Sequence, residues 1–219
     1  MVLLEFGDET LEIKPSKIVC LGRNYAEHAK EMKSEVPSRP VIFLKPPSAL
    51  IGPDETIILP KDSKNVHHEV ELAVIISQKA KNVKIEKAMD YVLGYTVLLD
   101  ITARDLQDEA KKKGLPWSVS KGYDTFAPIG PRVVDGEIDP HNLEIGLKVN
   151  GEIRQKGNTA RMIFKIPEII SYISSIMTLE PGDIIATGTP SGVGRIESGD
   201  EIEAWIEGIG VLKEKVIRE

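Results

Sequence analysis

The sequence contains a single cysteine, Cys20, which excludes an intramolecular disulfide. This scarcity fits a reducing compartment, so we expect a cytoplasmic protein. The apolar neighbours in I-V-C-L predict that Cys20 is a small buried residue rather than a nucleophile.

Long apolar runs and basic clusters are also missing from the sequence. No apolar run approaches the roughly 20 residues that span a bilayer, so we expect no transmembrane helix. The opening stretch M-V-L-L-E-F-G-D-E-T lacks the basic region and apolar core of a secretory signal peptide. The net charge is -6, and the run Lys111–Lys113 is typical of a solvated helix end. We therefore expect neither a membrane nor a nucleic acid as a partner.

Length and composition predict one globular domain over residues 1–219, because a chain of this size can bury one substantial core. A hydrophobic content of 41% and a charged content of 28% are ordinary for such a domain. Predicted strands outnumber predicted helices, and the helices are not regularly interleaved with them. This order favours a mixed α+β, strand-dominated fold over a doubly wound sheet.

Local patterns predict the individual elements. A strand pair occupies about 1–15, and Asn24 is placed to cap a short helix over 24–32, with Glu27 completing a capping box. Asn150-Gly151 is the turn signal of a hairpin over 144–155. Further helices are predicted over 84–92, over 103–113 with Gly114 closing it, and over 166–177 with Pro167 in its first turn.

Two glutamates interrupt the apolar pattern of a strand predicted over Val66–Ile76. Side chains along a strand alternate faces, so Glu69 and Glu71 point to the same side. If that side is buried, the carboxylates repel each other and lose hydration, so one takes up a proton or both share a cation. A solvated strand end with two hydrated glutamates is the alternative.

A third acid, Asp100, ends the apolar strand G-Y-T-V-L-L-D just before a predicted helix. An N-cap aspartate is one interpretation of this position. Three converging acids would instead form an oxygen-rich site for a hard divalent cation, whereas zinc would draw on histidine or cysteine. His67 and His68 face opposite ways on a regular strand; we expect His67 beside the glutamates and His68 in a hydrogen-bonded structural role.

His28 and Glu31 lie on one face of the short predicted helix, because Glu31 is three positions after His28. A carboxylate beside an imidazole fixes its tautomer and raises its basicity, as a general base acting on water requires. A surface His–Glu pair without a catalytic role is the alternative. The charged helix is also suited to a mobile lid.

A series of motifs makes the sequence resemble the fumarylacetoacetate hydrolase family from about Cys20 to the C-terminus. The similar branch is the short form, which includes acylpyruvate hydrolases, oxaloacetate decarboxylases and hydroxyheptadienedioate isomerases. The motifs are, in order, L-G-R-N-Y-A-E-H-A-K-E-M, I-F-L-K-P-P-S-A-L, H-H-E-V-E-L-A-V, L-D-I-T-A-R-D-L-Q-D-E-A-K-K-K-G-L-P-W, K-G-Y-D-T-F-A-P-I-G-P, V-N-G-E and P-G-D-I-I-A-T-G-T-P-S-G-V-G.

The resemblance implies a β-roll fold of the family's C-terminal domain type and a homodimer. It implies that Mg²⁺, for which Mn²⁺ or Ca²⁺ can substitute, is bound by Glu69, Glu71 and Asp100. It also implies a catalytic dyad on a mobile lid over about 22–38, an active-site lysine, and positions near the substrate. These are His28 and Glu31 for the dyad, Lys121 for the lysine, and Arg23, Gln107 and Thr189 for substrate binding.

The substrates implied by the resemblance are α-keto acids, in the catabolism of aromatic compounds. Because the His28–Glu31 pair is intact, hydrolysis of a carbon–carbon bond in an acylpyruvate is our first interpretation, with His28 activating water and Lys121 stabilising the pyruvate enolate. Oxaloacetate decarboxylation and 2-hydroxyhepta-2,4-diene-1,7-dioate isomerisation use a related enolate and stay open. A non-catalytic protein stabilised by its metal is the remaining alternative.

Overall fold

Strands dominate the computed structural model, which describes residues 1–136 and 138–219. They are β1 (Val2–Phe6), β2 (Glu9–Ile13), β3 (Ile18–Gly22), β4 (Val41–Lys45), β5 (Leu50–Ile51), β6 (Thr56–Leu59), β7 (Val66–His68), β8 (Val70–Ile76), β9 (Val92–Leu99), β10 (Thr102–Ala103), β11 (Ala127–Val134), β12 (Glu144–Val149), β13 (Glu152–Asn158), β14 (Ile184–Ala186), β15 (Gly194–Arg195), β16 (Glu201–Ile206) and β17 (Gly210–Arg218). The α-helices are α1 (Ala26–Glu31), α2 (Arg104–Lys113), α3 (Ser118–Lys121) and α4 (Ile166–Ile176), and the 3-10 helices are η1 (Pro47–Ala49), η2 (Ile85–Tyr91) and η3 (Thr159–Arg161). This balance confirms the predicted mixed, strand-dominated fold.

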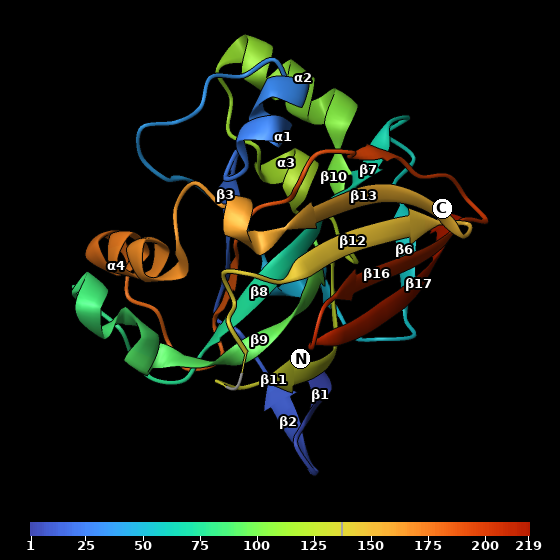
Figure 1. The fold of residues 1–219 in the computed structure, drawn as a ribbon. Coiled ribbons are helices and arrows are strands. Elements are labelled where there is room, and N and C mark those ends of the chain that lie inside the picture. The colour runs from blue at the N-terminus through green and yellow to red at the C-terminus, as the bar shows by residue number, and fades with distance from the viewer. Residues whose placement is uncertain (137) are drawn as a thin grey trace.

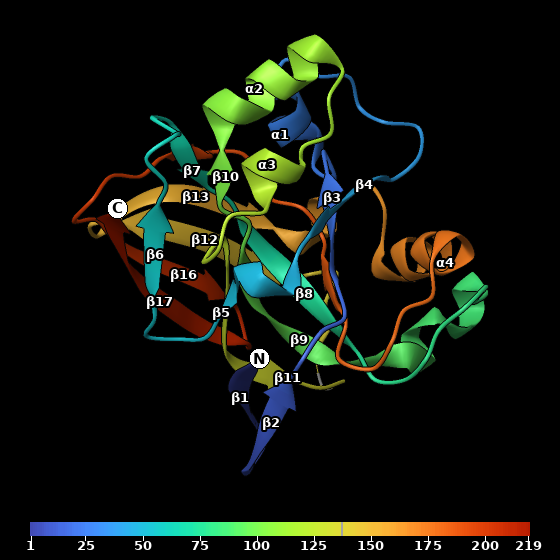
Figure 2. The same cartoon turned by 180° about the vertical axis from the view of Figure 1, so that it is seen from behind.

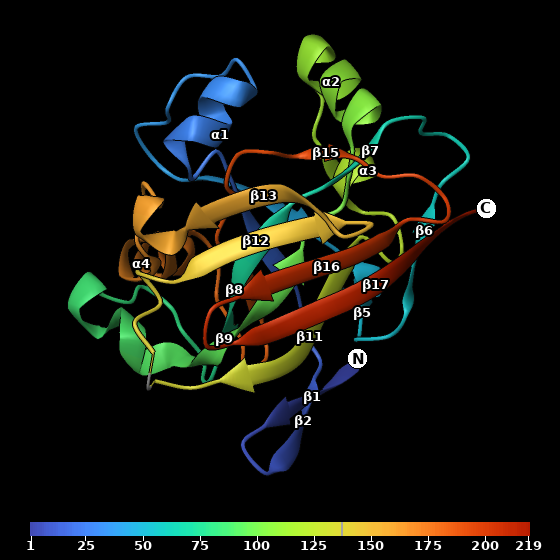
Figure 3. The same cartoon turned by 45° about the vertical axis from the view of Figure 1, so that its right-hand side comes forward.

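Within the described ranges the strands form three sheets. The largest has the order β2-β1-β11-β9-β8-β14-β3-β4, with β5 paired to β11. The others have the orders β13-β12-β16-β17-β6 and β10-β7-β15. Figure 3 shows β12, β13, β16 and β17 side by side in front of the central strands β8 and β9. Apolar side chains from these two layers form the core between them.

The helices gather in two places on the sheets. Figures 1 and 2 show α1, α2 and α3 together at one end of the molecule, with the β1–β2 hairpin at the opposite end. Helix α4 packs against η2 at one side. Helices α2 and α3 both contact β10, the strand that follows Asp100. The helical end therefore covers the region where the predicted site residues lie.

Several local predictions are confirmed by the backbone. Helix α2 ends at Gly114, whose φ of 66° is the left-handed conformation that glycine adopts readily. The β12–β13 hairpin turns at Asn150 and Gly151, with φ values of 52° and 81°. Helix α4 begins one residue before Pro167. Of the helices in the described residues, none is long and apolar enough to cross a membrane.

Two local predictions are wrong. Helix α1 begins at Ala26 with Tyr25 as its N-cap and no side-chain cap. Asn24 is buried instead. Its side-chain amide forms hydrogen bonds with backbone groups of two distant segments, at Phe164 and Thr187, and these replace the predicted capping box. The predicted strand over 66–76 is divided at Glu69, because β7 pairs with β10 and β15 while β8 pairs with β9 and β14.

Candidate functional site

The three predicted acids meet where two central strands run side by side. Glu69 lies between β7 and β8, Glu71 is in β8, and Asp100 follows β9, its backbone N–H donating to the Glu69 carbonyl at 2.9 Å. One carboxylate oxygen from each residue lies within 4.8 Å of the other two. The residues are 4%, 1% and 1% exposed, which excludes the solvated strand end. Asp100 does not cap α2, whose N-cap is Ala103.

Cationic side chains surround this acidic cluster. Lys121 Nζ donates to Glu69 Oε2 at 3.1 Å and also to Asp100 Oδ2, so its ammonium joins two of the three acids. Lys45 Nζ lies 2.8 Å from Asp100 Oδ1, and Arg104 pairs with Glu69 Oε1. Three buried cations therefore pair with Glu69 and Asp100, whereas Glu71 has no such ion pair in the described residues.

Sequence reasoning missed Lys45 and Arg104. Lys45 ends the apolar strand β4 and is 1% exposed, and Arg104 is the first residue of α2 and is 4% exposed. The sequence signal that could have identified Lys45 is a charged residue at the end of an otherwise apolar strand. Its partner Asp100 is far away in the sequence, so only the folded sheet shows that the two meet.

The two glutamates have opposite pKa shifts. Burial raises the pKa of Glu69, but Lys121 and Arg104 outweigh burial and hold that pKa well below its usual range. Burial, together with the charges of Asp100 and Glu69, raises the pKa of Glu71 well above its usual range. The Gly188 N–H donates to Glu71 Oε2 at 2.7 Å, which only partly opposes this shift. Glu71 is therefore the acid whose charge is least compensated by the protein.

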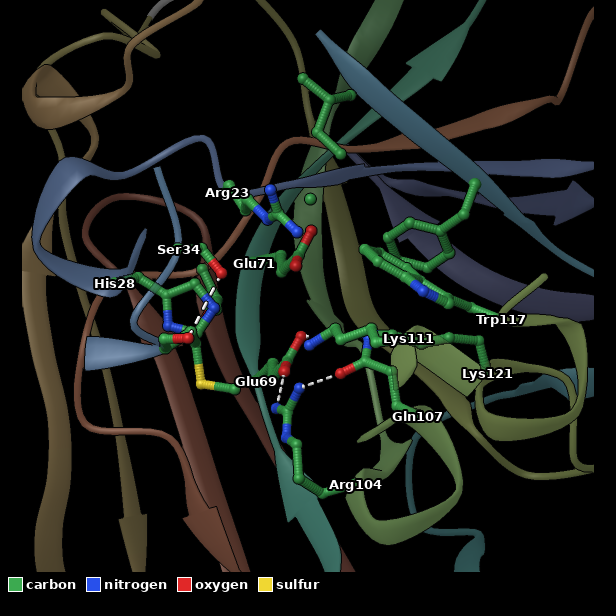
Figure 4. A pocket seen from close by; sticks show the side chains of 15 residues that line it. Arg23, His28, Ser34, Glu69, Glu71, Arg104, Gln107, Lys111, Trp117 and Lys121 are labelled. Carbon is green, nitrogen blue, oxygen red and sulfur yellow. Dashed lines mark hydrogen bonds and ion pairs between the residues drawn. The ribbon is translucent and has the colours of Figure 1, made fainter. Parts of the chain in front are cut away.

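The cluster opens into a pocket beneath the helical end. Figure 4 shows Glu69 and Glu71 on one wall, His28 from α1 on another, and Trp117 and Lys121 opposite. The free volume is about 30 Å³, which holds one or two waters but no α-keto acid. Helix α1 contributes His28 to the wall of this pocket.

The predicted dyad is formed. His28 Nδ1 lies 3.2 Å from Glu31 Oε2, and the His28 side chain is buried against the pocket. The carboxylate of Glu31 also accepts the Gly192 N–H at 3.0 and 3.2 Å. Glu31 therefore orients the imidazole and ties α1 to the glycine-rich 187–194 segment. With Nδ1 turned to Glu31, Nε2 is the imidazole nitrogen left for chemistry.

The three predicted substrate-binding residues all line the pocket. Arg23 has a φ of 63°, a left-handed conformation that is strained for a residue with a side chain. Gln107 Oε1 accepts from Arg104 at 2.7 Å. Thr189 uses its hydroxyl hydrogen on the Val70 carbonyl at 2.8 Å, so this hydroxyl is already committed as a donor.

Of the two adjacent histidines, His68 has the structural role expected of it, and His67 lies next to Arg104, which pairs with Glu69. His67 lies beside Arg104, with 3.4 Å between Nδ1 and the guanidinium Nε, and burial together with this charge lowers its pKa to about 4. His68 is fully buried, and its Nδ1 contacts Gln155 Oε1 at 2.9 Å. His67 is therefore neutral at pH 7 beside the cluster, and His68 has a hydrogen-bonded structural role.

The cluster fits a hard divalent cation. It offers carboxylate oxygens with no histidine or cysteine among them, which suits Mg²⁺ or Mn²⁺ better than Zn²⁺. Asp100 Oδ1, although near Lys45, has no aligned hydrogen-bond donor in the described part of the chain. Glu69, Glu71 and Asp100 would together hold such a cation, which would compensate the charge of Glu71.

Comparison with known proteins adds an independent line of evidence. Residues 17–217 match the family described as Fumarylacetoacetate (FAA) hydrolase C-terminal. The mitochondrial oxaloacetate tautomerase FAHD1 of Bos taurus is 54% identical over 202 residues, which cover 92% of this chain and 91% of that protein.

Two solved structures have the same fold. Fumarylpyruvate hydrolase from Pseudomonas aeruginosa, in complex with Mn²⁺ and pyruvate, superposes with a TM-score of 0.93 at 36% identity, covering 100% of this chain and 96% of that chain. The 2-hydroxyhepta-2,4-diene-1,7-dioate isomerase from Mycobacterium marinum gives a TM-score of 0.85 at 42% identity, covering 98% and 83%. Proteins with this architecture thus carry three differently named activities.

Proposed function

Because this chain belongs to the fumarylacetoacetate hydrolase family, we propose that it is a divalent-metal-dependent enzyme acting on the enol or enolate of a short α-keto acid. One observation carries this proposal. The buried cluster of Glu69, Glu71 and Asp100 adjoins a pocket that is also lined by His28, whose imidazole pairs with Glu31. A cation site and an oriented general base then act on one substrate.

The metal would be held by Glu69, Glu71 and Asp100. When bound, Mg²⁺ or Mn²⁺ supplies a Lewis acid that polarises the keto and carboxylate oxygens of the substrate. Support comes from the all-oxygen donor set and from the Mn²⁺ and pyruvate in the Pseudomonas aeruginosa relative. Lys121 and Arg104 place fixed positive charge beside the same point, where negative charge develops in an enolate.

His28 is the proposed general base. Its Nε2 takes a proton from the substrate carbon between two carbonyl groups, or from water. Glu31, facing Nδ1, stabilises the imidazolium that forms. Arg23 and Gln107, on the pocket wall, would bind the anionic groups of the substrate. Thr189 would contact the substrate as part of the pocket wall, because its hydroxyl already donates to the Val70 carbonyl.

Oxaloacetate keto–enol tautomerisation is the reaction that the comparisons favour. The Bos taurus relative with that name is 54% identical, whereas the relative named fumarylpyruvate hydrolase is 36% identical. Tautomerisation needs a proton moved between carbon and oxygen and no attacking water. In this proposal the His28–Glu31 pair moves the proton, while Lys121 and Arg104, beside the proposed cation site, stabilise the enolate.

Acylpyruvate hydrolysis, the first interpretation of the sequence, is the second candidate. The observation that favours it is the TM-score of 0.93 with a fumarylpyruvate hydrolase over the whole chain. Here His28 would deprotonate a water, and hydroxide would attack the distal carbonyl before the carbon–carbon bond breaks. This route requires the pocket to hold a water beside the substrate.

A two-substrate assay distinguishes these reactions. The loss of enol-oxaloacetate absorbance and the release of pyruvate from acetylpyruvate are followed with Mg²⁺, with Mn²⁺ and with EDTA. We expect the metal to accelerate both reactions, and the rate of oxaloacetate tautomerisation to exceed the rate of acetylpyruvate hydrolysis. A metal-dependent melting shift without turnover of either substrate would favour the non-catalytic alternative.

Three further features are proposals. The mobile lid over about 22–38 and a homodimer come from the family resemblance, and a cytoplasmic location comes from the single cysteine. Light scattering at micromolar concentration tests the dimer, and a mass near the 24.2 kDa of one chain would contradict it.

A further inference from the structure

Gln155 on β13 is a buried amide whose hydrogen-bonding capacity is fully used. Its Oε1 accepts from the Val70 N–H at 3.1 Å and from His68 Nδ1 at 2.9 Å. Its Nε2 donates to Thr189 Oγ1 at 2.8 Å and to the Pro190 carbonyl at 2.9 Å. The Val70 N–H can only donate and the Pro190 carbonyl can only accept, so the orientation of the amide is determined.

The Gln155 amide and the Thr189 hydroxyl close a hydrogen-bonded ring with the backbone N–H and carbonyl of Val70. Thr189 Oγ1, which accepts from Gln155, donates in turn to the Val70 carbonyl at 2.8 Å. Both backbone polar groups of Val70 are therefore fixed, one by the Gln155 oxygen and one through the Gln155 nitrogen. Val70 is the residue between Glu69 and Glu71, at the point where β7 ends and β8 begins.

The glycine-rich segment held by this ring also reaches the acidic cluster and the dyad. Its Gly188 N–H donates to Glu71 Oε2, and its Gly192 N–H donates to Glu31. The segment lies directly on β13: a Cβ on Gly157 would be 2.7 Å from the Pro190 Cβ, and one on Gly192 would be 2.2 Å from the Arg154 carbonyl. The segment that Gln155 contacts thus bonds to Glu71 through Gly188 and to Glu31 through Gly192.

We propose that Gln155 is a positioning residue that sets the relative orientation of Glu69 and Glu71 as ligands. The inference rests on the proposed function, because it requires these glutamates to bind a cation. Gln155 does not line the pocket, so it acts through Val70 and the 187–192 segment. Gln155→Leu keeps most of the side-chain volume but removes all four hydrogen bonds.

The test is a calorimetric titration with Mn²⁺, alongside thermal unfolding in the absence of metal. Wild type should bind one Mn²⁺ per chain, and Gln155→Leu should raise the dissociation constant at least tenfold. Ser174→Ala in α4 is the matched control, since it removes a buried hydroxyl that accepts from the Val83 N–H at 2.9 Å far from the site. It should lose thermal stability while its Mn²⁺ dissociation constant stays within twofold of wild type.

A second pair of variants keeps the proposal testable if Gln155→Leu does not fold. Thr189→Val removes the hydroxyl from the ring, and Thr189→Ser restores it. We expect the valine variant to weaken Mn²⁺ binding at least fivefold and the serine variant to remain within twofold. Folded variants that bind Mn²⁺ as wild type does would overturn the positioning role alone. Wild type without Mn²⁺ binding would overturn the proposed metal site and this inference together.

Discussion

Glu69 and Glu71 share one buried surface, yet their pKa values shift in opposite directions. Lys121 and Arg104 outweigh burial at Glu69, whereas burial and the neighbouring acids dominate at Glu71. The protein thus supplies more countercharge to Glu69 than to Glu71. This asymmetry links the fold of the central strands to the proposed metal chemistry.

The first prediction concerns the His28–Glu31 pair and the rate of oxaloacetate tautomerisation. His28→Ala should lower the rate of oxaloacetate tautomerisation by about 10²–10⁴-fold, the usual contribution of a positioned general base. Glu31→Gln keeps the side-chain size but removes the charge that supports the imidazolium, so its loss should be smaller. Mn²⁺ affinity should not change, because neither residue is a proposed ligand. Wild-type rates in both variants would remove His28 from the chemistry.

The buried ion pair of Lys45 and Asp100 makes the second prediction. Lys45→Met leaves Asp100 with less countercharge and should lower the free energy of unfolding by about 3–5 kcal/mol in the absence of metal. Saturating Mg²⁺ should recover part of that loss, since the cation replaces the missing charge.

Lys148→Met is the control for this variant, because the Lys148–Glu203 pair is about one-third exposed on each side. Its cost should stay below about 1 kcal/mol, with or without Mg²⁺. Denaturant titrations of both variants measure the difference. An equal loss for the two lysines would contradict a special role for the Asp100 pair.

The third prediction concerns Glu214 and the pH dependence of the free energy of unfolding. This carboxyl on the inner face of β17 is 3% exposed with no hydrogen-bond partner in the described residues, and burial with Asp54 and Glu55 raises its pKa to about 8. The folded protein therefore holds a proton that the unfolded chain releases above about pH 4.5. Stability from this group is complete below that pH and falls as pH rises to about 8.

Glu214→Gln should consequently stabilise the protein at pH 7, by up to about 3 kcal/mol, and make little difference at pH 4. Denaturant unfolding at the two pH values measures this. Glu12→Gln, on exposed β2, controls for the general effect of one lost carboxylate and should change stability by less than about 0.5 kcal/mol at both pH values. A stabilisation of equal size at pH 4 would contradict the assignment to Glu214.

Local sequence patterns predicted much of the fold. The alternation of apolar residues, the Asn150-Gly151 turn and the closing Gly114 act within a few residues, and the structure confirms them. The two-residue spacing of Glu69 and Glu71 likewise placed both carboxylates at one point. Even the interruption of the strand at Glu69 did not separate them, because Asp100 bonds to the Glu69 backbone across the sheet.

What the sequence could not give depends on contacts between distant segments. The Lys45 ammonium meets Asp100 only because β4 and β9 belong to one folded sheet. Asn24 has the residue type of a helix cap, yet buried backbone groups at Phe164 and Thr187 take its amide. Gln155 is one of several polar residues in β13, and its proposed role follows only from the ring that it closes with Thr189.

The central claim is that Glu69, Glu71 and Asp100 bind one divalent cation, and a calorimetric Mg²⁺ titration of wild type and Glu71→Gln tests it most directly. Wild type should bind one Mg²⁺ ion per chain. Because Glu71→Gln removes one anionic ligand, its affinity for Mg²⁺ should be at least about tenfold weaker, or roughly 1.4 kcal/mol. An affinity for Mg²⁺ that is unchanged in Glu71→Gln would contradict the claim.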